Sequence, residues 1–133
     1  MVVIFTTIFF ISGKLQALED IRNQQGIWVV RHNLISKDNI DLTINNIETL
    51  NIRNVYLQVR GRGYAYYNSA IEPKSPSIIG DFDPLSYFLS QARDKNINVH
   101  VWINTYLLWT APNNPSNRAH LYYRQPAWFE NNI

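Results

Sequence analysis

Polar side chains near the ends of two apolar runs are the residues best suited to contact a ligand. Gln58 and Arg60 end one run, and His100, Trp102 and Asn104 lie in or directly after another. Burying a polar side chain within an apolar strand is costly unless it has a hydrogen-bonding partner or faces a pocket. Because side chains alternate along a strand, Gln58 and Arg60 are expected to share one direction, and the other three residues likewise. We predict that both sets face a ligand; the alternative is a buried hydrogen-bond network that only braces the sheet.

Carboxylates are a second type of residue that could do chemistry, and the hydrolysis of a glycosidic bond is one reaction that they catalyse. That reaction usually needs two carboxylates, roughly 5–10 Å apart. Asp83 is better suited to cap a helix, because Pro84 follows it. None of the predicted strands ends in Asp or Glu. A catalytic pair within this chain is therefore not expected, and the catalytic residues stay unassigned. The candidates are Glu72, Asp81, Asp83 and Glu130.

Other catalytic and cofactor sites are not indicated. The chain has no cysteine, which excludes disulfides, thiolate zinc sites and a cysteine nucleophile. His32, His100 and His120 lack the spacing of a metal site, and no Gly-x-Ser-x-Gly motif is present for a serine nucleophile. We expect neither a metal ion nor an organic cofactor.

Two glycines follow the second apolar run, in the sequence Arg60-Gly61-Arg62-Gly63. A Gly-x-Gly after a strand suggests a phosphate loop, but the third glycine is missing and no helix starts there. Arginines beside glycines could also bind a sulfate or an acidic sugar. An anion or nucleotide site involving Arg60 and Arg62 is thus an open alternative.

Aromatic residues are frequent in the segments that follow the predicted strands. Sugar C–H faces stack on aromatic rings, so such residues near strand ends are typical of carbohydrate binding. The alternative is that the rings only pack one loop against another. The residues are Tyr64, Tyr66, Tyr67, Tyr106, Trp109, Tyr122, Tyr123 and Trp128.

Short apolar runs and amphipathic stretches supply the elements that would position these side chains. Ser36 and Asp83 are predicted N-caps, and Asn51 a left-handed C-cap. Ile40, Ile44 and Ile47 fall on one face of the first helix, and Leu85, Phe88, Leu89 and Ala92 on one face of the second. The strands are predicted over residues 26–30, 54–59 and 97–103.

The order strand–helix–strand–helix–strand predicts an α/β fold with parallel strands and right-handed crossovers. The segments after the second and third strands, 60–82 and 104–133, are much longer than the helix-to-strand connections. Long connections in compact folds are usually functional, and these lie at the carboxyl ends of parallel strands, where such folds bind ligands. A sheet of three strands with two helices has two edges without a pairing strand. These elements are therefore expected to belong to a larger β/α domain.

The composition is that of an ordinary globular domain: 133 residues, 46% apolar and 17% charged. A net charge of +2 does not indicate a nucleic-acid partner. The apolar run 2–11 is too short for a membrane-spanning helix, which needs roughly 20 residues. Residues 1–17 are a possible export leader, although no Lys or Arg precedes the run. A buried strand or an N-terminal extension is the alternative.

Four motifs come in order: GIWVVRHNL at 26–34, VYLQVRGRG at 55–63, FDPL at 82–85 and HVWINTY at 100–106. Together they resemble the N-terminal part of the glycosyl-hydrolase-like family ten proteins, which are bacterial, usually exported TIM-barrel glycosidases. The similarity covers residues from about 25 to 128. The resemblance implies that residues 25–133 are the first three units of an incomplete TIM (β/α)8 barrel.

The resemblance also implies a function, namely action on the O-glycosidic bonds of a polysaccharide or cell-wall glycan. The acidic residues that act in such barrels would lie on later strands, so this chain is not expected to be active alone. A non-catalytic carbohydrate-binding protein using the same face is the alternative. The implied substrate-binding residues are Gln58, Arg60, His100, Trp102, Asn104 and Tyr106.

Overall fold

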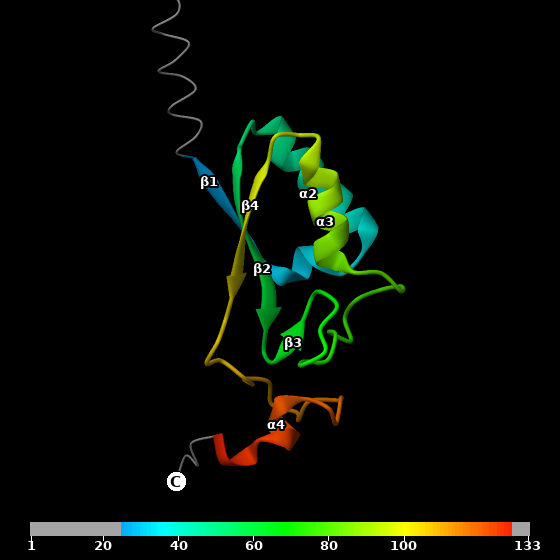
Figure 1. Cartoon of the computed structure of the whole chain (residues 1–133), viewed down its shortest axis with the longest axis vertical. Coiled ribbons are helices and arrows are strands. Elements are labelled where there is room, and N and C mark those ends of the chain that lie inside the picture. The colour runs from blue at the N-terminus through cyan, green and yellow to red at the C-terminus, as the bar shows by residue number, and fades with distance from the viewer. Residues whose placement is uncertain (1–24, 129–133) are drawn as a thin grey trace, which may run out of the picture.

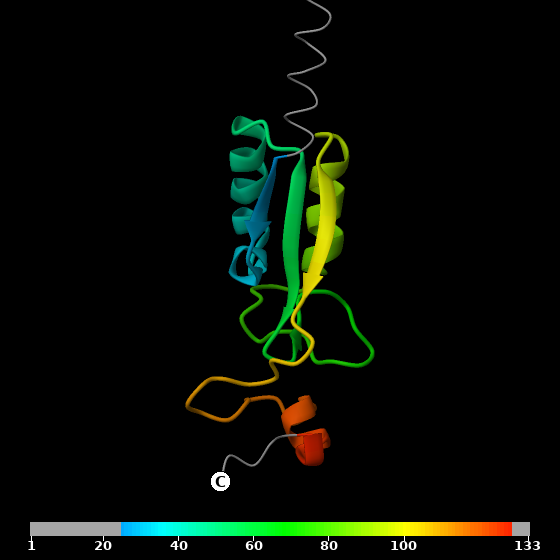
Figure 2. The same ribbon diagram turned by 90° about the vertical axis from the view of Figure 1, so that its left-hand side faces the viewer.

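The computed structural model describes residues 25–128, so the predicted leader 1–17 and the candidate Glu130 lie outside the described residues. Strand β2 (Asn54–Gly61) lies in the middle of the sheet and pairs in parallel with β1 (Gly26–Val29) on one side and β4 (Asn98–Ile103) on the other. Figure 2 shows the three strands side by side and running in the same direction. The predicted parallel β/α order is confirmed.

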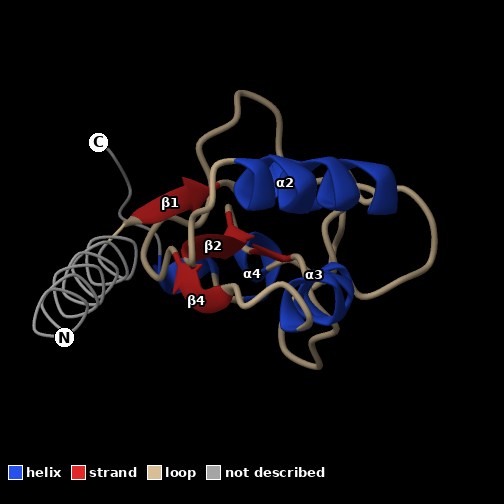
Figure 3. Cartoon of the chain, turned by 90° about the horizontal axis from the view of Figure 1, so that it is seen from above, coloured by secondary structure: helices blue, strands red, loops and turns tan. Residues whose placement is uncertain are grey.

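Two helices cover one face of this sheet, α2 (Lys37–Thr49) and α3 (Pro84–Arg93). Seen from above, they lie on the same side of the strands (Figure 3). Both N-caps are as predicted: Ser36 Oγ accepts from the backbone N–H of Asn39 at 3.2 Å, and Asp83 Oδ1 accepts from that of Ser86 at 2.9 Å. Each cap satisfies one of the N–H groups that a helix start leaves without a partner.

The core lies between the helices and the sheet. The three isoleucines predicted for the first helix are buried, and β2 contributes Val55, Leu57 and Val59. From α3, Phe88 and Ala92 are buried, whereas Leu89 is 42% exposed, so the predicted apolar face was too wide there. The buried isoleucines are Ile40, Ile44 and Ile47.

The segment after the predicted second strand has more regular structure than its sequence indicated. Strand β2 continues to Gly61, and a two-residue turn leads into β3 (Tyr64–Ala65), which pairs antiparallel with β2. Arg62 and Gly63, the turn residues, have φ values of 53° and 68°. Positive φ at both positions matches the twist of a tight hairpin. The Gly-x-Gly motif therefore forms a hairpin turn and not a strand-to-helix phosphate loop.

The carboxyl ends of β1, β2 and β4 lie at the same end of the molecule (Figure 1). Also there are the short elements η1 (Arg31–Leu34), β3, α4 (Leu121–Arg124) and η2 (Pro126–Trp128). Within residues 25–128 the sheet stays open, because β1 and β4 each pair with β2 alone. In that same range, no helix combines the length and apolar character needed to cross a bilayer.

Candidate functional site

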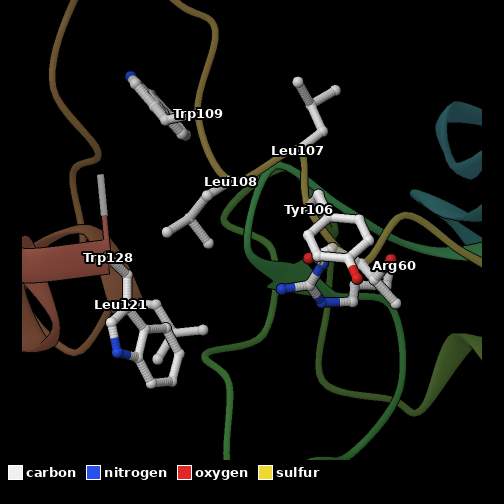
Figure 4. A pocket seen from close by; sticks show the side chains of 8 residues that line it. Arg60, Tyr106, Leu107, Leu108, Trp109, Leu121 and Trp128 are labelled. Carbon is white, nitrogen blue, oxygen red and sulfur yellow. Dashed lines mark hydrogen bonds between the residues drawn. The ribbon is translucent and has the colours of Figure 1, made fainter. Parts of the chain in front are cut away.

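A pocket of about 680 Å³ lies at the carboxyl ends of β2 and β4. Arg60 comes from β2, Leu121 from α4 and Trp128 from η2, and the chain that leaves β4 supplies the rest of the lining (Figure 4). In that view, Arg60 and Tyr106 lie on one side, and Leu121 and Trp128 on the other. The lining is thus mostly aromatic and aliphatic, with one guanidinium. The segment after β4 contributes Thr105, Tyr106, Leu107, Leu108 and Trp109.

Arg60 is held by a buried carboxylate, Glu72. Its Nε donates to both Glu72 oxygens, at 2.8 and 2.7 Å, and its Nη2 pairs with Oε1. Its Nη1 donates to the backbone carbonyls of Asn104 and Thr105. The guanidinium therefore joins β2, the segment before α3 and the chain that leaves β4. Its charge is balanced within the chain by Glu72, and its hydrogen bonds tie together the segments that form the base of the pocket.

The rings around the pocket differ in how much surface they leave free. Tyr106 is 98% exposed and Trp128 is 70% exposed. Trp109 is half-buried, and its indole N–H donates to the carbonyl of Asn113 at 2.8 Å. Tyr106 and Trp128 therefore have free ring faces beside the pocket, which is the arrangement that stacking on a sugar requires.

His120 attaches the pocket wall to the hairpin. Its Nε2 donates to the carbonyl of Arg62 at 2.6 Å, and its Nδ1 accepts from the backbone N–H of Tyr122 at 3.0 Å. The ring is fully buried against Tyr64 and Trp109, with centroid distances of 4.8 and 5.4 Å. Sequence reasoning gave His120 no role, and no local pattern could have linked it to a turn 58 positions earlier in the chain.

Gln58 precedes Arg60 by two residues but does not line the pocket, and its side chain is hydrogen-bonded to Arg31. It is 2% exposed, and its Oε1 accepts from the backbone N–H and the Nη1 of Arg31, at 3.3 and 3.1 Å. The pairing of β2 with β4 also shifts between Gln58 and Arg60, which oppose Trp102 and Ile103. The side chains of Gln58 and Arg60 are both buried, and each is held by its own partner, Arg31 for Gln58 and Glu72 for Arg60.

His100 and Trp102 are not among the residues that line the pocket. They belong to an aromatic row on the sheet face opposite the core, because Tyr56 alternates along β2 with the buried Val55 and Leu57. Trp28 stacks on Tyr56 at 4.8 Å and meets Trp102 edge-on at 5.1 Å, while Tyr56 stacks on His100 at 5.1 Å. The structure thus brings together Arg60, Tyr106 and the backbone of Asn104, and it places Gln58, His100 and Trp102 elsewhere.

Two of the described carboxylates near this end of the sheet, Glu72 and Asp83, are held by structural partners. Glu72 pairs with Arg60, and Asp83 caps α3 while its Oδ2 accepts from the backbone N–H of Asn68 at 2.8 Å. Asp81 is fully exposed and lies 3.9 Å from Lys74. The structure shows no pair of free carboxylates across the pocket within residues 25–128. No group of three potential metal ligands occurs in that range either.

Comparison with known proteins places the chain in a family. Residues 23–133 match the family described as Glycosyl hydrolase-like 10. Over 69 residues the chain is 32% identical to the glycosyl hydrolase DigH of Escherichia coli K12, and to its namesake in Shigella flexneri. That match covers 47% of this chain and only 16% of the relatives' length. The resemblance found in the motifs is confirmed, and the protein belongs to the glycosyl hydrolase-like 10 family.

Proposed function

We propose that residues 25–133 are the first three units of an incomplete (β/α)8 barrel and that the pocket at the strand ends binds a carbohydrate. The parallel order of β1, β2 and β4 and the family membership support the barrel. In such barrels ligands bind at the carboxyl ends of the strands, which is where this pocket lies. The observation that carries the proposal is the pair of exposed rings, Tyr106 and Trp128, beside that pocket.

We propose that the ligand is a polysaccharide or cell-wall glycan and that the longer protein hydrolyses its O-glycosidic bonds. Glycoside hydrolysis generally needs two carboxylates, and Glu72 and Asp83 are both held in structural interactions here. In this proposal the catalytic carboxylates come from further barrel units. The chain itself contributes to sugar binding, and export through the 1–17 leader is part of the same proposal.

Binding is tested by isothermal titration of the 133-residue chain with neutral oligosaccharides of several linkages. Trp128→Ala and Tyr106→Ala should each lower the affinity by about tenfold, because a stacking ring at a binding site is usually worth that much. Trp28→Ala is the matched control, since Trp28 is 61% exposed but belongs to the aromatic row on the open sheet face. Equal losses in Trp28→Ala and Trp128→Ala, or no saturable binding to any oligosaccharide, would refute the pocket.

A non-catalytic carbohydrate-binding role is the second candidate, favoured by the structural use of the described carboxylates. The hydrolase and the non-catalytic binding protein differ in whether they cleave the bound oligosaccharide. If the full-length protein binds oligosaccharides and releases no new reducing ends, binding alone is its function. Release of reducing ends that stops when a single carboxylate of a later unit is changed to its amide would identify the hydrolase.

A further inference from the structure

Arg31 is held against the end of β2 by packing and hydrogen bonding. A β-carbon added to Gly61 would lie 2.9 Å from Arg31 Cδ and 3.0 Å from its Nε and Nη1, so the guanidinium lies directly against the Gly61 backbone. Arg31 Nη1 donates to Gln58 Oε1, whereas Nε and Nη2 have no hydrogen-bond acceptor within residues 25–128. The edge formed by these two nitrogens is the part of an arginine that receives a planar oxyanion with two parallel hydrogen bonds.

Two further cationic or ionisable side chains share this place in the fold. Arg62 is the first turn residue after Gly61, and His32 follows Arg31 in η1. Burial lowers the pKa of His32 below its ordinary value, and the positive charges of Arg31 and Arg62 lower it further. Arg31 packs against Gly61, the residue that precedes Arg62, so the two arginines and His32 come from adjoining segments at the ends of β1 and β2.

Neither arginine of this region forms an ion pair within residues 25–128. The ion pairs there are Arg60 with Glu72, Lys74 with Asp81 and Lys95 with Glu48. Arg31 and Arg62 belong to none of them, although both are half-buried. Like charges held together in a partly buried place repel one another, and a bound anion relieves that repulsion. Arg60, by contrast, has its carboxylate and is not available for this role.

The charged region adjoins the pocket through His120. The carbonyl of Arg62 accepts from His120 Nε2 at 2.6 Å, and the next residue, Leu121, lines the pocket. We propose that Arg31, His32 and Arg62 form an oxyanion-binding site whose ligand is the carboxylate of an acidic sugar. The choice of a sugar rests on the proposed function of the neighbouring pocket.

His32 provides a direct test by NMR titration of its ring, with glucuronate as the probe and glucose as its neutral counterpart. Ionic strength is held constant with sodium chloride. Bound carboxylate should raise the pKa of His32 by about one pH unit, because an anion within a few ångströms favours the charged imidazolium. Glucose should leave the titration unchanged. No response of His32 to glucuronate would overturn the inference.

Variants test the assignment to these arginines. Arg62→Ala should weaken glucuronate binding by about tenfold, the usual cost of losing a charged hydrogen bond. Arg93→Ala removes the same charge from the last residue of α3, at the other end of the sheet, and should leave binding unchanged. Equal weakening in the two variants would overturn the site. A response to methyl sulfate as large as that to glucuronate would overturn the assignment to a carboxylate.

Failure of this inference is distinguishable from failure of the proposed function. Neutral oligosaccharides that bind in a Trp128-dependent manner without any response of His32 would refute the oxyanion site and support the pocket. A glucuronate response that depends on Arg62, in a chain that binds no neutral oligosaccharide, would support the oxyanion site and refute the pocket.

Discussion

Arg60 and Glu72 form a buried ion pair in which both carboxylate oxygens accept from the arginine Nε, at 2.8 and 2.7 Å. Both side chains are about nine-tenths buried. Removing one charge from such a pair leaves the other without compensation in a place that water reaches poorly. Breaking this pair from one side should therefore destabilise the fold more than breaking a surface ion pair would.

Glu72→Gln should lower the free energy of unfolding by about 3–5 kcal/mol, the usual cost of breaking a buried pair from one side. Glu48→Gln is the matched control, because Glu48 pairs with Lys95 but is 53% exposed. That variant should cost at most about 1 kcal/mol. Urea denaturation of both variants checks the prediction, and equal midpoints for the two would contradict it.

Gly63→Ala should detach α4 from the hairpin. An added β-carbon would lie 2.3 Å from His120 Nε2, and the φ of Gly63 is +68°. Gly80→Ala separates the two effects, because Gly80 has a φ of +90° but no atom within 4 Å of the added carbon. Hydrogen exchange at the Tyr122 amide, which donates to His120 Nδ1, should speed up in Gly63→Ala alone. Equal acceleration in both would show that backbone strain, and not the contact with His120, is responsible.

Tyr87 should ionise at higher pH than an ordinary tyrosine. Its hydroxyl donates to Asp41 Oδ1 and Oδ2, at 3.0 and 3.1 Å, across the two helices. That hydrogen bond is the main cause of the raised pKa, with desolvation and the charges of Asp41 and Asp38 adding to it. Since the folded pKa exceeds that of the unfolded chain, the contribution to stability is complete below pH 10 and is lost as pH rises through the folded value.

Asp41→Asn should bring the pKa of Tyr87 back toward 10, as followed by NMR of ring-labelled tyrosine. Tyr87→Phe identifies the signal and should remove this part of the alkaline pH dependence of stability. If the Tyr87 resonance titrates at the same pH in the parent chain and in Asp41→Asn, the carboxylate is not the cause of the shift.

The features that the sequence predicted correctly depend on residues only a few positions apart in the chain. Ser36 and Asp83 are caps because their side chains reach N–H groups three residues later. Asn51 has a φ of 54°, which is the left-handed conformation predicted for the residue that ends the first helix. The spacing of Ile40, Ile44 and Ile47 gave the buried face of α2 for the same local reason.

The features that sequence missed depend on contacts between distant segments. Nothing local to Glu72 indicates that it pairs with Arg60, and nothing local to His120 indicates that it bonds the hairpin. The alternation rule predicted one direction for Gln58 and Arg60, and nothing in the sequence indicated that the register of β2 against β4 shifts between these two residues. Arg60 was therefore identified as a site residue by type, while its partner came only from the fold.

Self-association of the 133-residue chain is expected from the open sheet. β4 is an edge strand in the described range, and its Val101 and Ile103 are 54% and 47% exposed. An exposed apolar strand with free backbone groups pairs readily with another chain, and a lysine there opposes that pairing.

Val101→Lys should lower the sedimentation coefficient at high protein concentration toward that of the monomer. Leu42→Lys, at a 62% exposed site on α2, should leave association unchanged. A parent chain that stays monomeric at all concentrations and melts in one sharp transition would show that these edges need no further barrel units to cover them.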